Sequence, residues 1–571
     1  MFPANEYPEP PQAPLRVACL GGGPGGLFTA IALAHKIPDV RIDVFERNRA
    51  DDIFGFGVVF SDATLDTIDQ VDPVLRETLA HNGRHWDTIE VRSKGQSMPA
   101  GGNGMAAVHR RTLLDALRER ATEMGARLHF STAVDVDTLD ASGNYDLIVA
   151  ADGANSSTRE RFLGELGHTV DEAAVKFIWF GTTYEFDGLT FLHAESEHGN
   201  FAVHAYPIGS GLSTFIVETD EPTWHRAGLD GFDTTLPAGP SDETTQRYLE
   251  HLFAEQIPGH RLVANNSRWA NFRTRRTHRW YTRTGGGTPV VLLGDAVHTA
   301  HFSVGSGTKM AMEDAAGLAQ ALADHHTDLD TALARFQDIR HPLVSRIQDA
   351  SLPSLAWWDH FADYHRSLEP WQFGFHFFSR AISTEKIRLR DPRFVSMAEQ
   401  AWNRRHGTGP LETVLQIGDV TFGTRLLQVQ AGTDTGVRIG DGSVSVTAFT
   451  PGPDLRVSPG LVLFTAPTID HTRLDDATRG ELDAVCSRRP AAVAVRGGTA
   501  LSRVLTSEYV RLTHHLPTIL IDSPTAVRTR RAVDERDNAA TMVLAGRADA
   551  VAYEYEPTST HSYPSYAEAR R

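Results

Sequence analysis

Cysteine is nearly absent from this sequence, and long apolar runs are missing. Its 571 residues include two cysteines, Cys19 and Cys486, which are too few for a disulfide framework or a structural zinc site. No HExxH or HxH cluster offers metal ligands, so no metal is expected. No apolar run reaches about 18 residues, and the polar, proline-rich residues 1–14 do not resemble a signal peptide. These absences predict a cytoplasmic protein that has no membrane partner.

Positive charge is scarce relative to negative charge. The formal net charge is −17 at pH 7, with 41% hydrophobic and 22% charged residues. This composition is typical of globular proteins, and the acidic balance argues against nucleic acid or an anionic membrane as a partner. The length allows about three to four domains.

A glycine-rich turn stands between an apolar strand and an apolar helix near the N-terminus. The strand, turn and helix are predicted over residues 17–20, 21–26 and 27–34. In a dinucleotide fingerprint Gly21 makes the tight turn, Gly23 lets the backbone approach a pyrophosphate, and Gly26 lets the helix pack closely on the strand. Glu46 follows the next strand, 20 residues after Gly26, and is placed to accept a hydrogen bond from a ribose hydroxyl.

The rest of the chain predicts an α/β fold with an inserted sheet. Alternating aromatic and β-branched runs over residues 176–219, broken by glycine turns, predict an antiparallel sheet. The doubly wound pattern resumes with a strand at 289–293 and a helix at about 308–324. We therefore predict a doubly wound, Rossmann-like domain with an inserted antiparallel β-sheet domain and a smaller α/β C-terminal domain. The predicted domain ranges are 1–175, 176–280, 281–405 and 406–571, the last with a disordered tail over 556–571.

Two further predicted strands end beside an aspartate and a glycine. One leads into Asp152-Gly153, and the other into Gly294-Asp295. The second continues through Gly305-Ser306-Gly307 into a helix. Either dipeptide alone is a common turn, but their order after the first glycine turn places all three motifs at C-terminal strand ends, where an open α/β sheet binds its ligand.

These motifs together resemble the single-component flavoprotein aromatic monooxygenases, the para-hydroxybenzoate hydroxylase-like class. The resemblance implies FAD in the doubly wound domain, NAD(P)H as a transient co-substrate and O2. It also implies oxygen transfer from a flavin hydroperoxide to an electron-rich ring that carries an ortho or para hydroxyl or amino group. It assigns cofactor binding to Gly21, Gly23, Gly26, Glu46, Arg47, Gly57, Val58, Arg110, Asp152, Asp295, Gly305, Gly307 and Thr308. Arg111 is the competing choice to Arg110.

Two departures from the common class pattern narrow the resemblance. Phe302 and Lys309 stand where many members have proline and asparagine. With them, residues 294–309 look like the branch of salicylyl-CoA 5-hydroxylases and 2-aminobenzoyl-CoA monooxygenases. The branch implies an ortho-hydroxy- or ortho-aminobenzoyl thioester, bound to CoA or a carrier protein, as the substrate. An indole or polyketide-like ring, or a flavin-bound redox or interaction protein without a substrate, stays an alternative.

The substrate ring is expected between the Gly-Asp strand and the inserted sheet. His301 is the predicted proton acceptor from the ring substituent, with a hydrogen-bonded loop histidine as the alternative. His298 is expected to be structural. The expected substrate contacts, which could equally pack a sheet core, are Trp179, Phe201, His204, Tyr206 and Phe302. Arg273, Arg275 and Arg276 could contact a phosphate or be solvated.

Residues 406–571 carry a weaker, second resemblance. Residues 515–520 and 544–552 look like the last strands of an old-yellow-enzyme barrel. A full (β/α)₈ barrel takes about 250 residues, and fewer remain here. We therefore predict a degenerate, non-catalytic remnant that serves packing or homodimer contacts and does not bind FMN.

Overall fold

The structure of the protein is a computed structural model. The residues that it describes are 14–52, 55–237, 239–325, 327–433, 436–440, 444–448, 460–525, 527 and 534–555. The predicted tail over 556–571 lies outside the described residues. The chain forms two compact units: unit 1 comprises Met1–Ile89 and Asn103–Ser351, and unit 2 comprises Glu90–Gly102 and Leu352–Arg571. The division falls at 351/352, whereas the sequence placed a domain boundary near 406.

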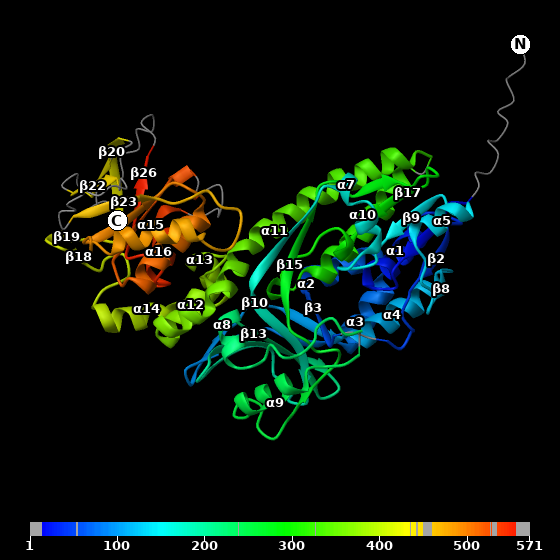
Figure 1. The fold of residues 1–571 in the computed structure, drawn as a ribbon, viewed down its shortest axis with the longest axis horizontal. Coiled ribbons are helices and arrows are strands. Elements are labelled where there is room, and N and C mark those ends of the chain that lie inside the picture. The colour runs from blue at the N-terminus through cyan, green and yellow to red at the C-terminus, as the bar shows by residue number, and fades with distance from the viewer. Residues whose placement is uncertain are drawn as a thin grey trace, which may run out of the picture. The chain divides into compact units, whose positions relative to one another are not determined.

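The core of unit 1 is a six-stranded, mostly parallel sheet with the strand order β16-β17-β9-β1-β2-β8. Its strands are β1 (Arg16–Leu20), β2 (Arg41–Phe45), β8 (Arg127–His129), β9 (Leu147–Ala150), β16 (Tyr281–Arg283) and β17 (Pro289–Leu292). From Val17 to Leu20, β1 is apolar and buried on both faces, as the interior strand of a parallel sheet must be. The helices α1 (Pro24–Lys36) and α10 (Gly307–Asp324) pack against each other beside this sheet (Figure 1). The predicted doubly wound fold is confirmed.

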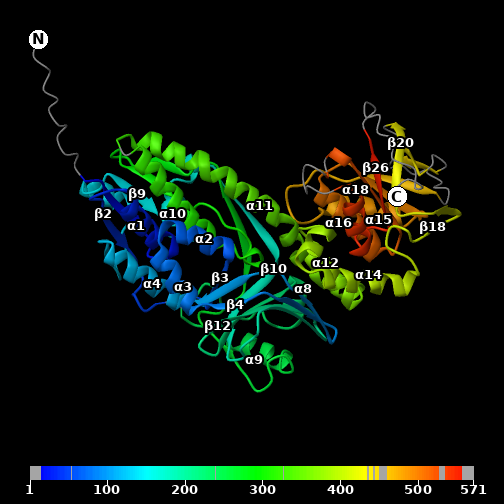
Figure 2. The ribbon, with the colours of Figure 1, turned by 180° about the vertical axis from the view of Figure 1, so that it is seen from behind.

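An antiparallel sheet forms the second layer of unit 1, with the strand order β14-β10-β13-β12-β11 and with β15 also paired to β10. Its strands are β10 (His168–Thr182), β11 (Leu189–Ser196), β12 (Gly199–Gly209), β13 (Leu212–Thr219), β14 (Leu262–Val263) and β15 (Ala270–Thr277). One face packs Phe215 and Val217 against Leu249 and Phe253 of α9 (Glu243–Leu252) and its C-cap. Figure 2 shows α9 beside this sheet. Side chains alternate between the two faces of a strand, so the other face is left for the site described below.

Shorter elements complete unit 1. A three-stranded sheet of β3 (Gly57–Ser61), β7 (Met105–His109) and β4 (Arg84–Trp86) lies in the order β3-β7-β4. The remaining helices are α2 (Asp62–Val71), α3 (Pro73–Asn82), α4 (Arg110–Glu123), α5 (Val136–Ser142), α6 (Ser157–Arg161), α7 (Leu163–Leu166) and α8 (Glu221–Arg226). α11 (Leu329–Ser367) contains the division between the units.

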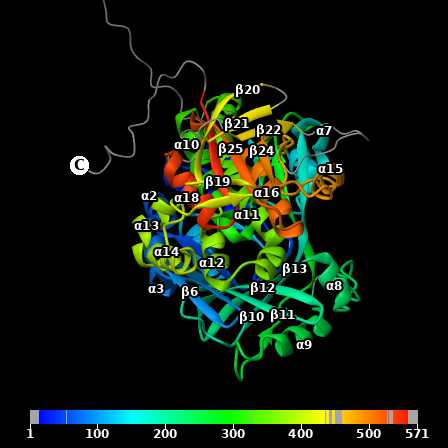
Figure 3. The ribbon, with the colours of Figure 1, turned by 90° about the vertical axis from the view of Figure 1, so that its left-hand side faces the viewer.

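Unit 2 contains a closed barrel of strands β20 to β26 (Figure 3). They are β20 (Leu426–Thr433), β21 (Gly436–Ile439), β22 (Val444–Ala448), β23 (Leu461–Thr465), β24 (Ala492–Arg496), β25 (Thr518–Asp522) and β26 (Ala550–Glu554). The first three pair antiparallel and the others parallel, and β26 pairs with β20 to close the ring. Aliphatic side chains such as Ile439, Ala494 and Ile519 fill it. The predicted last two strands correspond to β25 and β26, and the non-catalytic role stays a prediction.

Unit 2 also contains helices and short strands outside the barrel, and β5 begins at the last residue of unit 1 before the division. The helices are α12 (Pro370–Phe378), α13 (Thr384–Arg390), α14 (Pro392–His406), α15 (Asp476–Cys486), α16 (Ala500–Thr513) and α18 (Glu535–Leu544), and the strands are β5 (Ile89–Ser93), β6 (Gln96–Ala100), β18 (Leu415–Ile417) and β19 (Val420–Phe422). No helix among the described residues of either unit is long and apolar enough to cross a membrane.

A buried polar cluster joins α11, α12 and α16 within unit 2. Glu508 accepts a hydrogen bond from the Tyr364 hydroxyl at 2.5 Å and lies 3.0 Å from Nε2 of His376, with Nε of Arg547 at 3.6 Å. Burial acts to raise the pKa of Glu508, but His376, Arg547 and Tyr364 outweigh it, and the net pKa is lowered. The carboxylate is therefore charged and compensated, as a buried charge has to be.

Acid is expected to destabilise unit 2 through two histidines. Burial lowers the pKa of His376 and His365 to about 4, with Arg547 and Lys94 adding to the effect. Below about pH 6.5 the unfolded chain binds a proton at each position, while the folded chain does not until about pH 4. Stability is therefore lost as the pH falls through this window, by up to ~3 kcal/mol for each histidine. Thermal unfolding measured from pH 7 to 4 checks this, and His365→Gln should remove part of the slope. A pH-independent melting temperature contradicts it.

Candidate active site

In the glycine turn of unit 1, residues 21–26, some glycines are tightly packed against backbone and one faces open space. Gly21 has φ +107°, and a Cβ there would lie 2.3 Å from the carbonyl oxygen of Ala151. A Cβ on Gly26 would lie 2.0 Å from the carbonyl oxygen of Gly21, whereas one on Gly23 would meet nothing within 4 Å. Gly23 is also the N-cap of α1, without a side-chain cap. The open N-terminus of α1 can therefore receive a pyrophosphate on its backbone N–H groups.

Glu46 is held beside this turn by three donors. Its Oε2 accepts from the backbone N–H of Gly22 at 2.9 Å, and its Oε1 accepts from the backbone N–H and the side-chain amide of Asn48 at 2.9 and 2.8 Å. Each carboxylate oxygen can accept more than one hydrogen bond, so a ribose hydroxyl can still be accommodated. Arg47, next to it, is exposed.

A cavity of about 530 Å³ extends from this turn to the antiparallel sheet. Its glycine-rich end is lined by Gly23, Gly153, Gly294, Asp295, Gly305 and Gly307. Gly57, Val58, Arg110 and Thr308 also line it. Eight of the thirteen residues predicted to bind the cofactor therefore line one space, although they come from five separate stretches of sequence. The other five, which are not among the described lining residues, are Gly21, Gly26, Glu46, Arg47 and Asp152.

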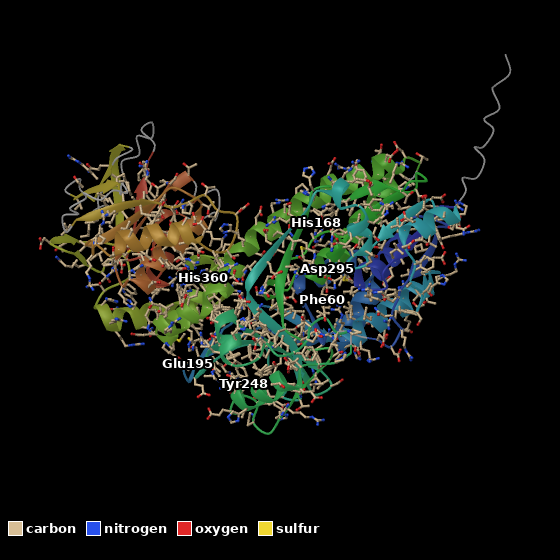
Figure 4. The ribbon with its side chains drawn as sticks, viewed as in Figure 1. Phe60, His168, Glu195, Tyr248, Asp295 and His360 are labelled. Atoms are coloured by element: carbon tan, nitrogen blue, oxygen red, sulfur yellow. The ribbon has the colours of Figure 1, made fainter. Side chains whose placement is uncertain are left out.

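Asp295 is the carboxylate of this cavity. Its side chain is accessible from the cavity, and Figure 4 labels it in unit 1. The surrounding protein raises its pKa by desolvation, while the charges of His298, Arg110 and Arg275 oppose that shift. Arg110 is half-buried, whereas Arg111 is exposed and its N–H donates to the His109 cap. The geometry thus favours Arg110 over Arg111 as a cofactor contact.

A buried ion-pair chain fixes the loop that carries Asp295. Nε2 of His298 lies 2.6 Å from Oδ2 of Asp314, which also accepts from the backbone N–H of Gly294 at 3.1 Å. Nε of Arg340 lies 2.9 Å from the other oxygen of Asp314. His298 is therefore a structural residue, in agreement with the sequence interpretation. Arg340 was missed because it comes from α11, far along the chain and outside any motif.

Asp152 lies beside the cavity, and its neighbours Gly153 and Ala154 line it. Its Oδ2 accepts from the backbone N–H of Thr158 at 3.1 Å, and its Oδ1 is buried without a hydrogen-bond partner among the described residues. Sequence reasoning also missed Arg159, whose two terminal nitrogens donate to the carbonyls of Ala154 and Ala296. Arg159 thereby ties the Asp-Gly loop to the Gly-Asp loop.

The other end of the cavity is aromatic. It is lined by Phe177, Trp179, Phe191, His204, Tyr206 and Ile216, all from one face of the antiparallel sheet. Trp179, His204 and Tyr206 therefore lie where a substrate ring is expected. The expected substrate contact of Phe201 is corrected: it is fully buried on the opposite face, in the core with Phe215. Phe201 is offset from His204 and Tyr206 by odd numbers of residues, so the alternation of side chains along a strand puts it on the core side.

His301 and Phe302 follow the Gly-Asp loop, and only Phe302 is among the described residues that line the cavity. Phe302 lines the cavity, and its ring centroid lies 5.1 to 6.2 Å from those of Phe177, His204 and Trp179. His301 is 3% exposed and is not among the described lining residues. Its Nδ1 lies 2.8 Å from Oγ of Ser303. Its part in proton transfer stays a prediction.

The arginines near β15 are mostly paired. Arg273 forms an ion pair with Glu172 at 2.9 Å, and Arg276 forms one with Asp349 at 3.1 Å. Arg275 is buried, and burial lowers its pKa. Among the described residues, no group of three or more His, Cys, Asp or Glu side chains is placed to hold a metal ion.

These residues fit FAD. The open cradle at Gly23 and Gly153, with the buried Oδ1 of Asp152 beside it, suits the pyrophosphate. Asp295 suits a ribityl hydroxyl, and the N-terminus of α10 suits the flavin. A family model described as "FAD binding domain" matches residues 15–351, which is more than half of the chain. The chain belongs to this FAD-binding family.

Relatives extend the likeness beyond unit 1. The chain is 50% identical over 542 residues to a salicyloyl-CoA 5-hydroxylase of a Streptomyces species, an alignment that covers 94% of this chain and 99% of that protein. It is 35% identical to a 3-hydroxy-4-methyl-anthranilyl-(aryl-carrier protein) 5-monooxygenase of Streptosporangium sibiricum, over 61% of this chain and 90% of that protein. A solved 2-methyl-3-hydroxypyridine-5-carboxylic acid oxygenase matches with a TM-score of 0.48 and 19% identity, over 60% of this chain and 90% of the other. The family match and the relative that is 50% identical over nearly its whole length show that the protein is an FAD-dependent monooxygenase.

Asp295→Ala is expected to weaken FAD retention. The substitution removes an acceptor for a ribityl hydroxyl, at a cost on the order of 1–3 kcal/mol. The wild-type protein should be yellow with one non-covalent FAD per chain, and the variant should lose FAD at lower dilution during dialysis. Asp324→Ala, at the end of α10, serves as the control because Asp324 is not among the described lining residues. Equal retention by both variants contradicts the role of Asp295.

Proposed function

We propose that the protein hydroxylates an electron-rich aromatic ring held as a thioester, an ortho-hydroxy- or ortho-aminobenzoyl group on CoA or a carrier protein. The observation that carries this proposal is the single cavity, which begins at the FAD-binding glycines and ends at an aromatic sheet face. The identity of 50% with a salicyloyl-CoA 5-hydroxylase over nearly all of both chains supports the same class of substrate.

When bound, FAD supplies the redox chemistry, because it accepts a hydride from NAD(P)H and activates O2. The residues of the chain orient the ring and exclude water. Phe302, Phe177 and Trp179 offer ring faces and edges that suit an aromatic substrate. An apolar wall also limits loss of the activated oxygen to solvent.

A substrate screen tests the proposal. The purified holoenzyme is given salicyloyl-CoA, 2-aminobenzoyl-CoA, the two free acids and indole, while NAD(P)H consumption and product mass are followed. A hydroxylated thioester, with much weaker turnover of the free acids, supports the proposal. Product from indole alone favours the indole-type alternative. NAD(P)H oxidation that no aromatic compound stimulates favours a flavin-bound redox protein and overturns it.

A further inference from the structure

A buried carboxylate lies in the antiparallel sheet next to the cavity wall. Glu218 of β13 is 1% exposed. Its cross-strand neighbours are Phe177 on β10 and Ala202 on β12, and it lies two residues from the cavity-lining Ile216 on the same face. A buried charge persists only where it has a charged or hydrogen-bonding partner.

Two imidazoles approach the same oxygen of this carboxylate. Nε2 of His204 lies 2.7 Å from Oε1 of Glu218, and Nε2 of His301 lies 3.9 Å from it. His204 is diagonal to Glu218 across β12 and β13, because it is paired with Ile216. Of the two histidines, His204 is the one that lines the cavity. When one nitrogen of an imidazole faces a substrate and a carboxylate contacts the other nitrogen, the carboxylate orients the imidazole and stabilises its protonated form.

We infer that His204 accepts the proton of the substrate's ring hydroxyl and that Glu218 is its positioning residue. The inference rests on the proposed function, hydroxylation of a ring with an ortho hydroxyl group. The O–H bond breaks, the proton goes to the imidazole, and the electron pair stays on the ring oxygen. The ring then donates more strongly to an electrophilic oxygen, and the carboxylate balances the new imidazolium charge.

Other polar side chains near the cavity are less suited than His204 to accept the proton. Tyr206 lines the same wall, but burial raises its pKa to about 12, and its hydroxyl donates to the carbonyl of Gly57 at 3.2 Å. Asp295 lies with the glycines of the cavity, and Arg110 carries a guanidinium, which has no acceptor for a proton. His193 of β11 is on the same face, since Ala202 is its cross-strand neighbour too, and it is not among the described lining residues. His301 then acts only as a second basic group near Glu218.

Aromatic rings restrain the imidazole of His204 on two sides. The Phe191 ring centroid lies 5.0 Å away and that of Phe302 lies 5.2 Å away, both edge-on. Phe191 and Phe302 line the cavity as well. The proton acceptor is thus held by packing on a strand, which is more rigid than the loop that carries His301.

The first test compares coupling of salicyloyl-CoA hydroxylation to NAD(P)H oxidation in His204→Asn, Glu218→Gln and His301→Gln. His204→Asn should lower hydroxylation by about 10²-fold, with flavin reduction kept and NAD(P)H spent on hydrogen peroxide. Glu218→Gln should move the acidic limb of the pH–rate profile to lower pH, because the imidazolium loses its carboxylate. His301→Gln should lower hydroxylation less than about 10-fold.

Matched controls come from the same unit. His225→Asn breaks an exposed pair with Asp230, whose atoms lie 2.8 Å apart. Glu195→Gln changes an exposed glutamate of β11 that lies far from Asp295 in Figure 4. Both should keep the wild-type coupling ratio and pH profile. A loss in His301→Gln that equals or exceeds the loss in His204→Asn overturns the inference and makes His301 the acceptor.

A second test needs no turnover. Salicyloyl-CoA is bound to the oxidised holoenzyme without NAD(P)H, and phenolate absorbance is titrated against pH. His204→Asn should move phenolate formation to higher pH by at least about one unit, and His225→Asn should not move it. Unchanged phenolate formation in His204→Asn overturns the inference even if the thioester is hydroxylated. Normal phenolate formation without any hydroxylated product in the wild type instead counts against the proposed function alone.

Discussion

Gly26→Ala is expected to abolish FAD retention. The new Cβ would lie 2.0 Å from the carbonyl oxygen of Gly21, a distance that real Cβ atoms do not reach. The obstacle is backbone, so relief requires the glycine turn or the start of α1 to move. That turn is the cradle for the pyrophosphate, and its displacement removes the open N–H groups at Gly23.

The measurement is flavin bound per chain after desalting, with circular dichroism to follow the fold. Gly164→Ala is the matched control, because Gly164 lies in α7 of the same unit and a Cβ there would meet nothing within 4 Å. The control should keep its FAD. Recovery of Gly26→Ala with one FAD per chain would show that the turn tolerates the methyl group and that the close packing is not required.

Glu508→Ala is expected to destabilise unit 2 more than any surface change. The substitution leaves Arg547 buried beside His376 and Tyr364 without their shared carboxylate. Breaking a buried ion pair by removing one partner costs about 3–5 kcal/mol. For a unit of this size we expect the melting temperature to fall on the order of 10 °C.

Urea and thermal unfolding of the FAD-saturated protein check this result. Glu481→Ala, an exposed glutamate of α15 in the same unit, is the control. It should change stability by no more than about 0.5 kcal/mol. Equal stability of the two variants would mean that Arg547 finds other acceptors, since it also donates to the Ser379 hydroxyl and the His376 carbonyl.

The cofactor end of the site could be predicted well from sequence because the structural requirements there involve residues that are close together in the chain. A parallel strand must be apolar on both faces, a tight turn into a helix must be glycine, and a ribose needs a carboxylate at the next strand end. The residue types and the spacing of Gly21, Gly26 and Glu46 are therefore enough to predict their roles. The structure places Asp295 and Arg110 in one cavity with Gly23 of the same turn.

The substrate end could be predicted less well because it depends on which face of a strand is covered. In residues 201–206 the side chains point alternately to the two faces of the strand, but the sequence does not show which of the two sets packs against α9. The structure puts Phe201 against that helix and turns His204 to the cavity. Arg159 and Arg340 had no motif to mark them, and the sequence assigned no role to Glu218, since the partners of these residues are distant in sequence.

By itself, the sequence determined the doubly wound fold and the dinucleotide-binding turn, and its resemblance to a known family implied FAD and the branch of enzyme. The fold and the turn follow from short-range patterns in which each residue type meets a backbone or phosphate requirement within about 30 residues of chain. Only the tertiary structure decided which histidine reaches the substrate cavity and which carboxylate supports it. That choice depends on strand register and on the packing of one sheet face, which bring residues 204, 218 and 301 together although nothing in their local sequence requires it.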